Sequence, residues 1–278
     1  MEIASLDMVA IMPLFLLLCA LGCLAGFLAG LLGIGGGTVL VPGFLFIFGA
    51  LGYDTPYIMH LAVGTSLAVI IATGSSSAYA HFRRGSVDRR AFIVLAPALI
   101  LGVILGTFTA DILSGVQLQI IFAVMLFLIS LNMFRGAKVT PDDHSLRGNP
   151  VVYGATTLIG GVATIMGVGG AVLTVPLMAL HGVKMQRAVG TGAALGLMVA
   201  IPGAIGFMVI GWDVNEGLPP LSFGFVNLLA WLAVIPFTVL CAPLGVAVAH
   251  KMMPAKLRRA FAIFMMILAA NMAIEIWL

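Results

Sequence analysis

Two glycine-rich strings are the places where this sequence could do chemistry. The first, GIGGGTVLVP, runs from Gly33 to Pro42, and the second, GVGGAVLTVP, runs from Gly167 to Pro176. Glycine lets the backbone leave one helix and begin another. The unpaired amides at the amino end of a helix, together with the positive end of the helix dipole, bind anions without any formal charge. The two strings therefore predict an anion site made largely of backbone amides.

A second pair of motifs would add hydroxyl groups to this site. AVGTS at residues 62–66 matches AVGTG at residues 188–192. The predicted substrate-binding residues come from both pairs of motifs, and they are Gly35, Gly36, Gly37, Thr38, Gly64, Thr65, Ser66, Gly169, Gly170, Gly190 and Thr191. Three polar residues beside the second pair are candidates for gating or steering the anion: His60, Gln186 and Arg187.

Each of these interpretations has a structural alternative. The glycines of the strings could serve only close helix packing, and we prefer that role for Gly22, Gly26 and Gly30, which are spaced by four residues, and for Gly102 and Gly106. The polar candidates have alternatives too, since a histidine at the end of a span is commonly an interfacial residue and a basic residue there can serve orientation alone.

The composition requires a membrane around these motifs. Hydrophobic residues make up 62% of the 278 residues, charged residues make up 8%, and the formal net charge is +3. A soluble chain carries about 25% charged residues, so this one cannot cover a surface that faces water. Soluble enzymes and nucleic-acid binders are therefore excluded. We expect an all-α polytopic membrane protein, because the uncharged runs are far longer than the strands of a membrane barrel.

The uncharged runs predict about ten transmembrane segments. The runs at residues 8–53 and 148–183 are too long for one span, and each contains a glycine string near its middle. We break both runs there, because a glycine cluster interrupts a helix. The break leaves two short segments, 38–52 and 171–183, which we expect to cross the membrane, although a partial crossing would give the same distribution of charge.

The basic residues predict the orientation of these segments. With the amino terminus outside and ten crossings, all thirteen Lys and Arg residues fall in inner loops, while seven of the ten acidic residues fall outside. Basic residues collect on the cytoplasmic side of membrane helices. We therefore expect a multi-pass membrane protein with both termini on the side opposite the cytoplasm.

The motifs also predict an internal repeat. The glycine strings match at an offset of 134 residues, and the AVGT motifs and Gly85 with Gly211 match at an offset of 126. With five segments in each copy, the second copy enters the membrane in the opposite sense, which is the inverted-topology repeat of many secondary transporters. The expected organisation is a first repeat at 1–135, a cytoplasmic linker loop at 136–149 and a second repeat at 150–278.

Together these residues resemble one known family, the TauE/SafE sulfite exporters, also called TSUP. The resemblance rests on the two glycine strings, on HLAVGTS from His60 to Ser66, and on the stretch from Ser75 to Gly85 that ends in HFRRG. It implies a secondary transporter of the bacterial inner membrane, with both termini in the periplasm, for sulfite, organosulfonates or related small sulfur-containing anions, which in several members exports them. The second glycine string differs from the first, with Ala171 and Val172 where the first has Gly37 and Thr38, so we expect an asymmetric site.

The predicted mechanism places a sulfur-containing anion at mid-membrane between the two helix amino ends, with alternating access by the two halves. The expected partners are this anion and the lipid bilayer, with a coupling proton or ion as an open alternative; no nucleic acid, cofactor or metal is expected. We expect no enzyme activity, because the spans contain no catalytic constellation. An anion channel, with the same glycine loops lining a pore, remains the alternative function.

Overall fold

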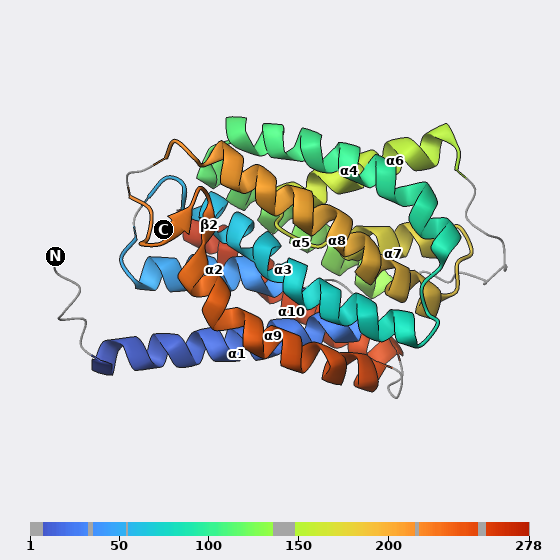
Figure 1. Ribbon diagram of the computed structural model, residues 1–278, viewed down its shortest axis with the longest axis horizontal. Coiled ribbons are helices and arrows are strands. Elements are labelled where there is room, and N and C mark those ends of the chain that lie inside the picture. Colours follow the sequence, from blue (N-terminus) through green and yellow to red (C-terminus); the bar gives the residue numbers. More distant parts are fainter. Residues whose placement is uncertain are drawn as a thin grey trace.

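Helices form almost all of the computed structural model, which describes residues 8–32, 36–53, 55–135, 148–214, 217–249 and 254–277. Figure 1 shows the helices side by side along the long axis of the molecule. Their bounds are α1 Met8–Leu32, α2 Gly37–Ala50, α3 Ile58–Arg83, α4 Arg89–Ile112, α5 Gly115–Arg135, α6 Pro150–Ile165, α7 Ala171–Leu180, α8 Met185–Ile210, α9 Leu228–Ala249 and α10 Pro254–Trp277. Two strands, β1 Ser222–Phe223 and β2 Val226–Asn227, precede α9.

The helices fall into two length classes. Among the described residues, α3, α4, α5, α8 and α9 are each long and apolar enough to cross a membrane. The helices α2 and α7 have 14 and 10 residues. At 1.5 Å per residue they reach about 21 Å and 15 Å, whereas the hydrocarbon core of a bilayer is about 30 Å thick. Neither short helix is therefore long enough by itself to span the hydrocarbon core, and the crossing of segments 38–52 and 171–183 stays a prediction.

Large apolar side chains cover the outside of the helix bundle. The most exposed include Ile112 at 84% and Val151 at 78%, and others on several helices are more than 60% exposed, among them Phe82, Leu158 and Leu240. A surface of this kind is unstable in water and suits contact with lipid. The outside of the bundle therefore agrees with the membrane environment that the composition predicts.

Two groups of four helices make up most of the bundle. In the first group, α1 and α3 both pack against α9, and α2 packs against α3. In the second group, α6 and α8 both pack against α4, and α7 packs against α8. We call these the α9 group and the α4 group. They meet where α3 packs against α8 at the centre of the molecule, and α5 pairs with α10 (Figure 1).

Glycine determines the closest helix contacts inside each group. A Cβ added to Gly22 of α1 would lie 2.8 Å from the carbonyl oxygen of Val234 in α9, and Gly26 and Gly30 face the backbone of α9 further along. A Cβ added to Gly106 of α4 would lie 2.6 Å from the carbonyl oxygen of Gly161 in α6, and Gly102 faces α6 in the same way. The packing role predicted for these five glycines is confirmed.

The segment before α9 is not helical, although it belongs to an uncharged run that predicts a helix. Residues 217–227, which belong to the apolar run before residue 250, form a turn and a short antiparallel hairpin that pairs Phe223 with Val226. Pro219 and Pro220 lie in the turn before the hairpin, and Leu221 after them has φ 59°, which is not a helical conformation. Asn227 then caps α9, because its Oδ1 accepts a hydrogen bond from the Ala230 amide at 2.9 Å.

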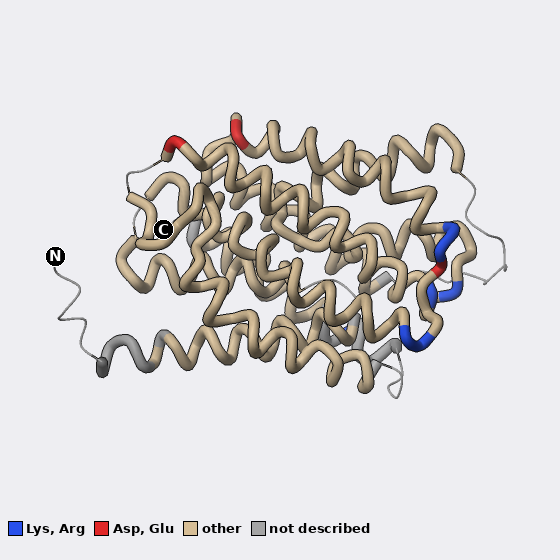
Figure 2. The backbone as a smooth tube through the Cα atoms, in the orientation of Figure 1, with Lys and Arg blue, Asp and Glu red and all other residues tan. Residues whose placement is uncertain are grey.

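The charged residues lie at the two ends of the bundle. Figure 2 shows Lys and Arg gathered at one end with a single acidic position among them, and other acidic positions at the opposite end. The basic end contains the connection from α3 to α4, where Asp88 caps α4 by accepting hydrogen bonds from the amides of Arg90 and Ala91, each at 3.0 Å. The helix α1 begins at the end away from the basic residues (Figures 1 and 2).

Candidate functional site

The two glycine strings meet in the core of the protein. Gly37, the first residue of α2, lies so close to the carbonyl oxygen of Gly167 that a Cβ at position 37 would collide with it. The same Cβ would lie 2.8 Å from the Cα of Val168. Two loops that are 130 residues apart in the sequence are therefore in direct contact, and this contact joins the starts of both short helices. Gly35 lies outside the described residues.

Glycine is required at both helix starts because of the backbone conformation there. Gly36 has φ 78° and Gly170 has φ 70°, a left-handed conformation in which other residues are strained. Neither helix has a side-chain cap. The carbonyl oxygen of Gly36 accepts hydrogen bonds from the third and fourth amides of α2, and that of Gly170 does the same for α7. The amino ends of α2 and α7 thus begin as matching, uncapped turns in buried positions.

Two threonine hydroxyls at these helix starts are buried and unpaired. Thr38 in the first turn of α2 and Thr174 in the first turn of α7 are both fully buried. Neither Oγ1 atom has a hydrogen-bond partner among the described residues. Buried hydroxyls are normally paired, so these two are the free hydrogen-bonding groups that the site offers. Thr38 was predicted, whereas Thr174 was missed because it lies two positions after Val172, the residue that aligns with Thr38.

The hydroxyls of Ser66, Thr65 and Thr191, which were also predicted for the site, instead form hydrogen bonds between different parts of the chain. The Ser66 hydroxyl donates to the carbonyl oxygen of Gly167 at 2.8 Å, which fixes the second glycine loop to α3. The Thr65 Oγ1 accepts from the Asn227 amide at 3.0 Å, and the Thr191 Oγ1 accepts from the Asp88 amide at 2.8 Å. Thr65 and Thr191 therefore lie at the starts of α9 and α4, and the structure gives them roles in joining helices.

The glycines beside these threonines also pack against backbone. Gly64 lies against the carbonyl oxygen of Phe225, just before α9, and Gly190 lies against the carbonyl oxygen of Ser86, just before α4. A Cβ added to Gly196 would lie 2.7 Å from the carbonyl oxygen of Gly169, so the second glycine loop contacts α8 as well. The structure brings Gly36, Gly37, Thr38, Gly169 and Gly170 to the helix starts, while Gly64 and Gly190 lie at the joints with α9 and α4.

The described contacts of the three gating candidates are with other parts of the protein than the glycine loops. His60 is buried, and its Nε2 atom lies 3.1 Å from the carbonyl oxygens of Ala110 and Leu113 at the end of α4. Two acceptors require a hydrogen on Nε2, so His60 donates to both carbonyls and ties α3 to α4. Gln186 and Arg187 are exposed in the first turn of α8, at the basic end.

Comparison with known proteins identifies the family to which this chain belongs. Residues 18–272 match the family described as Sulfite exporter TauE/SafE. The chain belongs to this family. Because the TauE/SafE match spans most of the chain and five described helices are long and apolar enough to cross a membrane, the protein is a multi-pass membrane protein of a transporter family.

Relatives of this TauE/SafE chain are named as membrane transporters. A "Probable membrane transporter protein" from Haemophilus influenzae is 33% identical over 263 residues, covering 94% of this chain and 99% of the relative. "Probable membrane transporter protein YunE" from Bacillus subtilis is 27% identical over 257 residues, covering 86% and 89%. "Probable membrane transporter protein MJ0441" from Methanocaldococcus jannaschii is 26% identical over 251 residues, covering 88% and 91%. No solved structure matches the chain.

The core of this TauE/SafE protein is free of charged side chains in the part that the structure describes. The buried polar side chains there belong to Thr, Ser, His and Asn. No group of three or more metal-ligating side chains occurs among the described residues. A ligand at the glycine loops would therefore meet amide and hydroxyl donors, which suit an anion.

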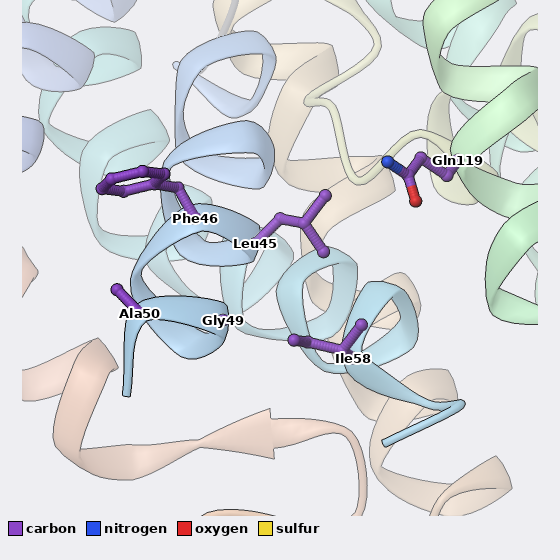
Figure 3. Close-up of a pocket in the computed structure, with 6 residues that line it drawn as sticks. All are labelled: Leu45, Phe46, Gly49, Ala50, Ile58 and Gln119. Atoms are coloured by element: carbon purple, nitrogen blue, oxygen red, sulfur yellow. The ribbon is translucent and has the colours of Figure 1, made fainter. Parts of the chain in front are cut away.

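A pocket at the far end of α2 does not belong to this site. It has a volume of about 400 Å³, and Figure 3 shows its lining residues, which come from the carboxyl half of α2, from α3 and from α5: Leu45, Phe46, Gly49, Ala50, Ile58 and Gln119. The Gln119 amide donates to the carbonyl oxygen of Met272 in α10 at 3.3 Å. The other five lining residues are apolar or glycine, so this pocket suits a hydrocarbon chain better than an anion.

Proposed function

We propose that this protein is a secondary transporter that moves sulfite, organosulfonates or related small sulfur-containing anions across the bacterial inner membrane by alternating access, in the direction of export. The anion binds between the amino ends of α2 and α7. In this proposal the termini lie in the periplasm, and the basic end of the bundle in Figure 2 faces the cytoplasm.

One observation carries the proposal: the contact between Gly37 and Gly167 in a core without charged side chains among the described residues. It brings together two helix amino ends that each lack a side-chain cap. Paired short helices with glycine breaks in the two halves of a chain are the best sequence pointer to a transporter's binding site. Thr38 and Thr174 then supply the two unpaired hydroxyls, and an anion satisfies both.

An inverted repeat is part of the proposal, and matched details in the two halves support it. Pro42 and Pro176 each occupy the sixth position of their short helix. The hydrogen bond from Asn227 to Thr65 at the start of α9 has a counterpart in the bond from Asp88 to Thr191 at the start of α4. In the same way α1 packs on α9 while α6 packs on α4.

We further propose that the moving bodies are the α9 group and the α4 group. Each group contains three helices of one half of the sequence and one helix of the other half. The glycine contacts of α1 with α9, and of α4 with α6, bring backbone against backbone and leave no room for sliding. The groups meet where α3 packs on α8, so a change of access opens the space between these two central helices first.

In this mechanism the predicted site residues have two different roles. In this proposal the amide donors come from Gly36 and Gly37 at the start of α2 and from Gly169 and Val172 at the start of α7, with Thr38 and Thr174 as hydroxyl donors. The amides of Gly170 and Ala171 already donate to the carbonyl oxygens of Val168 and Gly169, each at 2.8 Å. Ser66 holds the second glycine loop in place through its bond to Gly167. Thr65 joins α3 to the start of α9, and Thr191 joins α8 to the start of α4. His60 joins α3 to the end of α4, and Gln186 and Arg187 are exposed in the first turn of α8, so we assign none of the three to the anion site.

The test is counterflow of labelled sulfite in proteoliposomes. Vesicles with the purified protein are loaded with unlabelled sulfite and diluted into buffer that contains a trace of ³⁵S-sulfite. A transporter exchanges one for the other, so the label accumulates transiently above its outside concentration. Taurine, isethionate and sulfate are then added outside to compete, and acetate serves as the anion without sulfur.

Two results contradict the proposal in different ways. Sulfite movement without transient accumulation means that the protein only dissipates gradients, which identifies the channel alternative. Equal competition by acetate, or no movement of any sulfur anion, overturns the substrate assignment.

A further inference from the structure

A stripe of buried polar residues runs along one face of α3. Ser66, Thr73, Ser77 and His81 follow one another at intervals of seven, four and four residues, which places them on the same side of a helix. All four are buried, with at most 2% of the side chain exposed. We call Ser66, Thr73, Ser77 and His81 the α3 stripe.

The α3 stripe begins at the glycine loops and ends at the basic end of the bundle. Ser66 donates to Gly167, and a Cβ added to Gly37 would lie 3.0 Å from the Cδ1 atom of Ile70, which occupies the same face. His81 lies in the last turn of α3, followed by Arg83 and Arg84 at the end where Figure 2 shows the basic residues. The stripe thus connects the proposed anion site with one side of the membrane.

Ser77 is the residue that points to a ligand. A helical hydroxyl commonly bonds to the carbonyl four residues earlier, as Thr73 does with Val69 at 3.1 Å. The Ser77 hydroxyl has no such bond and no other hydrogen-bond partner among the described residues, although it is only 1% exposed. A buried hydroxyl without a partner costs free energy, and a passing or bound anion satisfies it.

The matching face of α8 is apolar. At the offset of 126 residues that aligns Ser66 with Gly192, the positions of Thr73, Ser77 and His81 correspond to Val199, Gly203 and Phe207. These residues are buried and continue from the glycine loops toward the opposite end of the bundle, with Val199 against Gly170. The two routes away from the site therefore differ in chemistry, polar toward the basic end and apolar toward the other.

We infer that the α3 stripe is the route by which a small oxyanion or sulfonate passes between the glycine loops and the basic end, with Ser77 as a hydrogen-bond donor to it. This inference rests on the proposed function for the identity of the cargo. Hydroxyl donors replace part of the water that the anion loses, and the stripe carries no fixed positive charge in its middle that would trap it. The apolar face of α8 is the barrier on the other side.

The first test is the Ser77→Ala variant. Transport, measured as kcat/KM for the anion, is expected to fall about tenfold or more, because a hydrogen bond to a charged group is lost. The unfolding temperature is expected to stay the same or rise, since the variant loses only an unpaired buried hydroxyl. Ser75→Ala is the matched control: Ser75 is exposed and donates to Ile71 of its own helix at 2.6 Å, so its loss leaves transport unchanged. Normal transport by Ser77→Ala, or loss of transport together with lower stability, overturns the inference.

The second test measures access to position 77 without transport. Cys19, Cys23 and Cys241 are first replaced by alanine, and Ser77→Cys is then exposed to the anionic reagent 2-sulfonatoethyl methanethiosulfonate in inside-out vesicles. We expect labelling from the cytoplasmic side, slowed by excess isethionate, and no labelling of the control Phe207→Cys, which lies on the apolar face of α8 beyond the glycine loops. Labelling without transport by the parent protein would contradict the proposed function and leave the route intact. Transport with no labelling at position 77 would contradict the route alone.

Discussion

The hydroxyls of Thr38 and Thr174 are chemically alike, since both are fully buried in the first turn of a short helix and both are unpaired. Replacing either by valine keeps the shape and removes the hydroxyl. We expect Thr38→Val and Thr174→Val each to weaken anion binding about tenfold or more, because a hydrogen bond to an anion contributes about 1.5–3 kcal/mol. The measurement is the rise of the unfolding temperature with anion concentration, which reports binding to the folded state.

The control for these variants is Thr156→Val in α6. Thr156 is also fully buried, but its hydroxyl donates to the carbonyl oxygen of Val152 at 2.7 Å. We expect this variant to lose a little stability and to keep its response to the anion. If Thr156→Val and Thr38→Val lose the response equally, the hydroxyl at the helix start has no special role.

Ser66 acts on the site through the second glycine loop. Its hydroxyl bond to Gly167 is buried, so Ser66→Ala leaves the carbonyl oxygen of Gly167 without that donor. We expect the free energy of unfolding to fall by about 1 kcal/mol or more. A denaturation curve in detergent measures the change, with Thr109→Ala as a control, because Thr109 is exposed and bonds only within α4. Equal stability of the two variants would mean that the bond does not hold the loop.

The sequence was sufficient to predict some site residues and insufficient for others. Gly36, Gly37 and Gly170 could be predicted, because glycine strings in apolar runs mark helix breaks. Thr174 could not be found by alignment, since the second half carries its hydroxyl two positions later than the first. Thr65 could be found as a polar residue, but its bond to Asn227 depends on a contact across 162 residues, which no local pattern reveals.

At the scale of helices, glycine has opposite effects at different positions. A Cβ on Gly30 of α1 would collide with the carbonyl oxygen of Ala242 in α9, whereas a Cβ on Gly49 of α2 meets no atom within 4 Å. We expect Gly30→Ala to destabilise the protein by about 1–3 kcal/mol through overpacking. Gly49→Ala should instead stabilise it by about 0.5–1 kcal/mol, because alanine favours a helix. Thermal unfolding in one detergent compares them, and a Gly30→Ala variant as stable as wild type would rule out the close contact.

The positions of the helices in the sequence were largely predictable, but the sequence does not show which helices pack against each other. Uncharged runs broken at the two glycine strings give ten segments, and ten helices are described. The hairpin before α9 was missed, because counting charges ignores Pro219 and Pro220. The spacing of Gly22, Gly26 and Gly30 predicts a packing face, but nothing local indicates that α9 covers it.

At the scale of the whole molecule, the two four-helix groups are expected to move against each other during transport. Gly74 of α3 and Leu197 of α8 face each other across the boundary between the groups, with a distance of 3.2 Å from an added Cβ to Leu197 Cδ2. In a chain without its native cysteines, Gly74→Cys and Leu197→Cys are the positions chosen for an oxidative cross-link. We expect oxidation to stop sulfite counterflow and reduction to restore it, because the link fixes α3 to α8.

A link inside one group is the matched control. Gly43 of α2 faces Leu21 of α1, both in the α9 group, and this is again a glycine against a leucine. Oxidised Gly43→Cys with Leu21→Cys is expected to transport normally. The proposed movement is contradicted if the disulfide between positions 43 and 21 stops counterflow and the disulfide between positions 74 and 197 does not.

The pairing of α1 with α9 also has a consequence for biosynthesis. The helix α1 ends at Leu32 and α9 begins at Leu228, so about 200 residues are made between them. At roughly 5–20 residues per second, the ribosome needs about 10–40 s for that stretch. During this time the glycine face of α1 lies in the bilayer without its partner. The insertion machinery therefore has to keep an early helix available for a late one, and the first half cannot complete its packing before the second half has emerged.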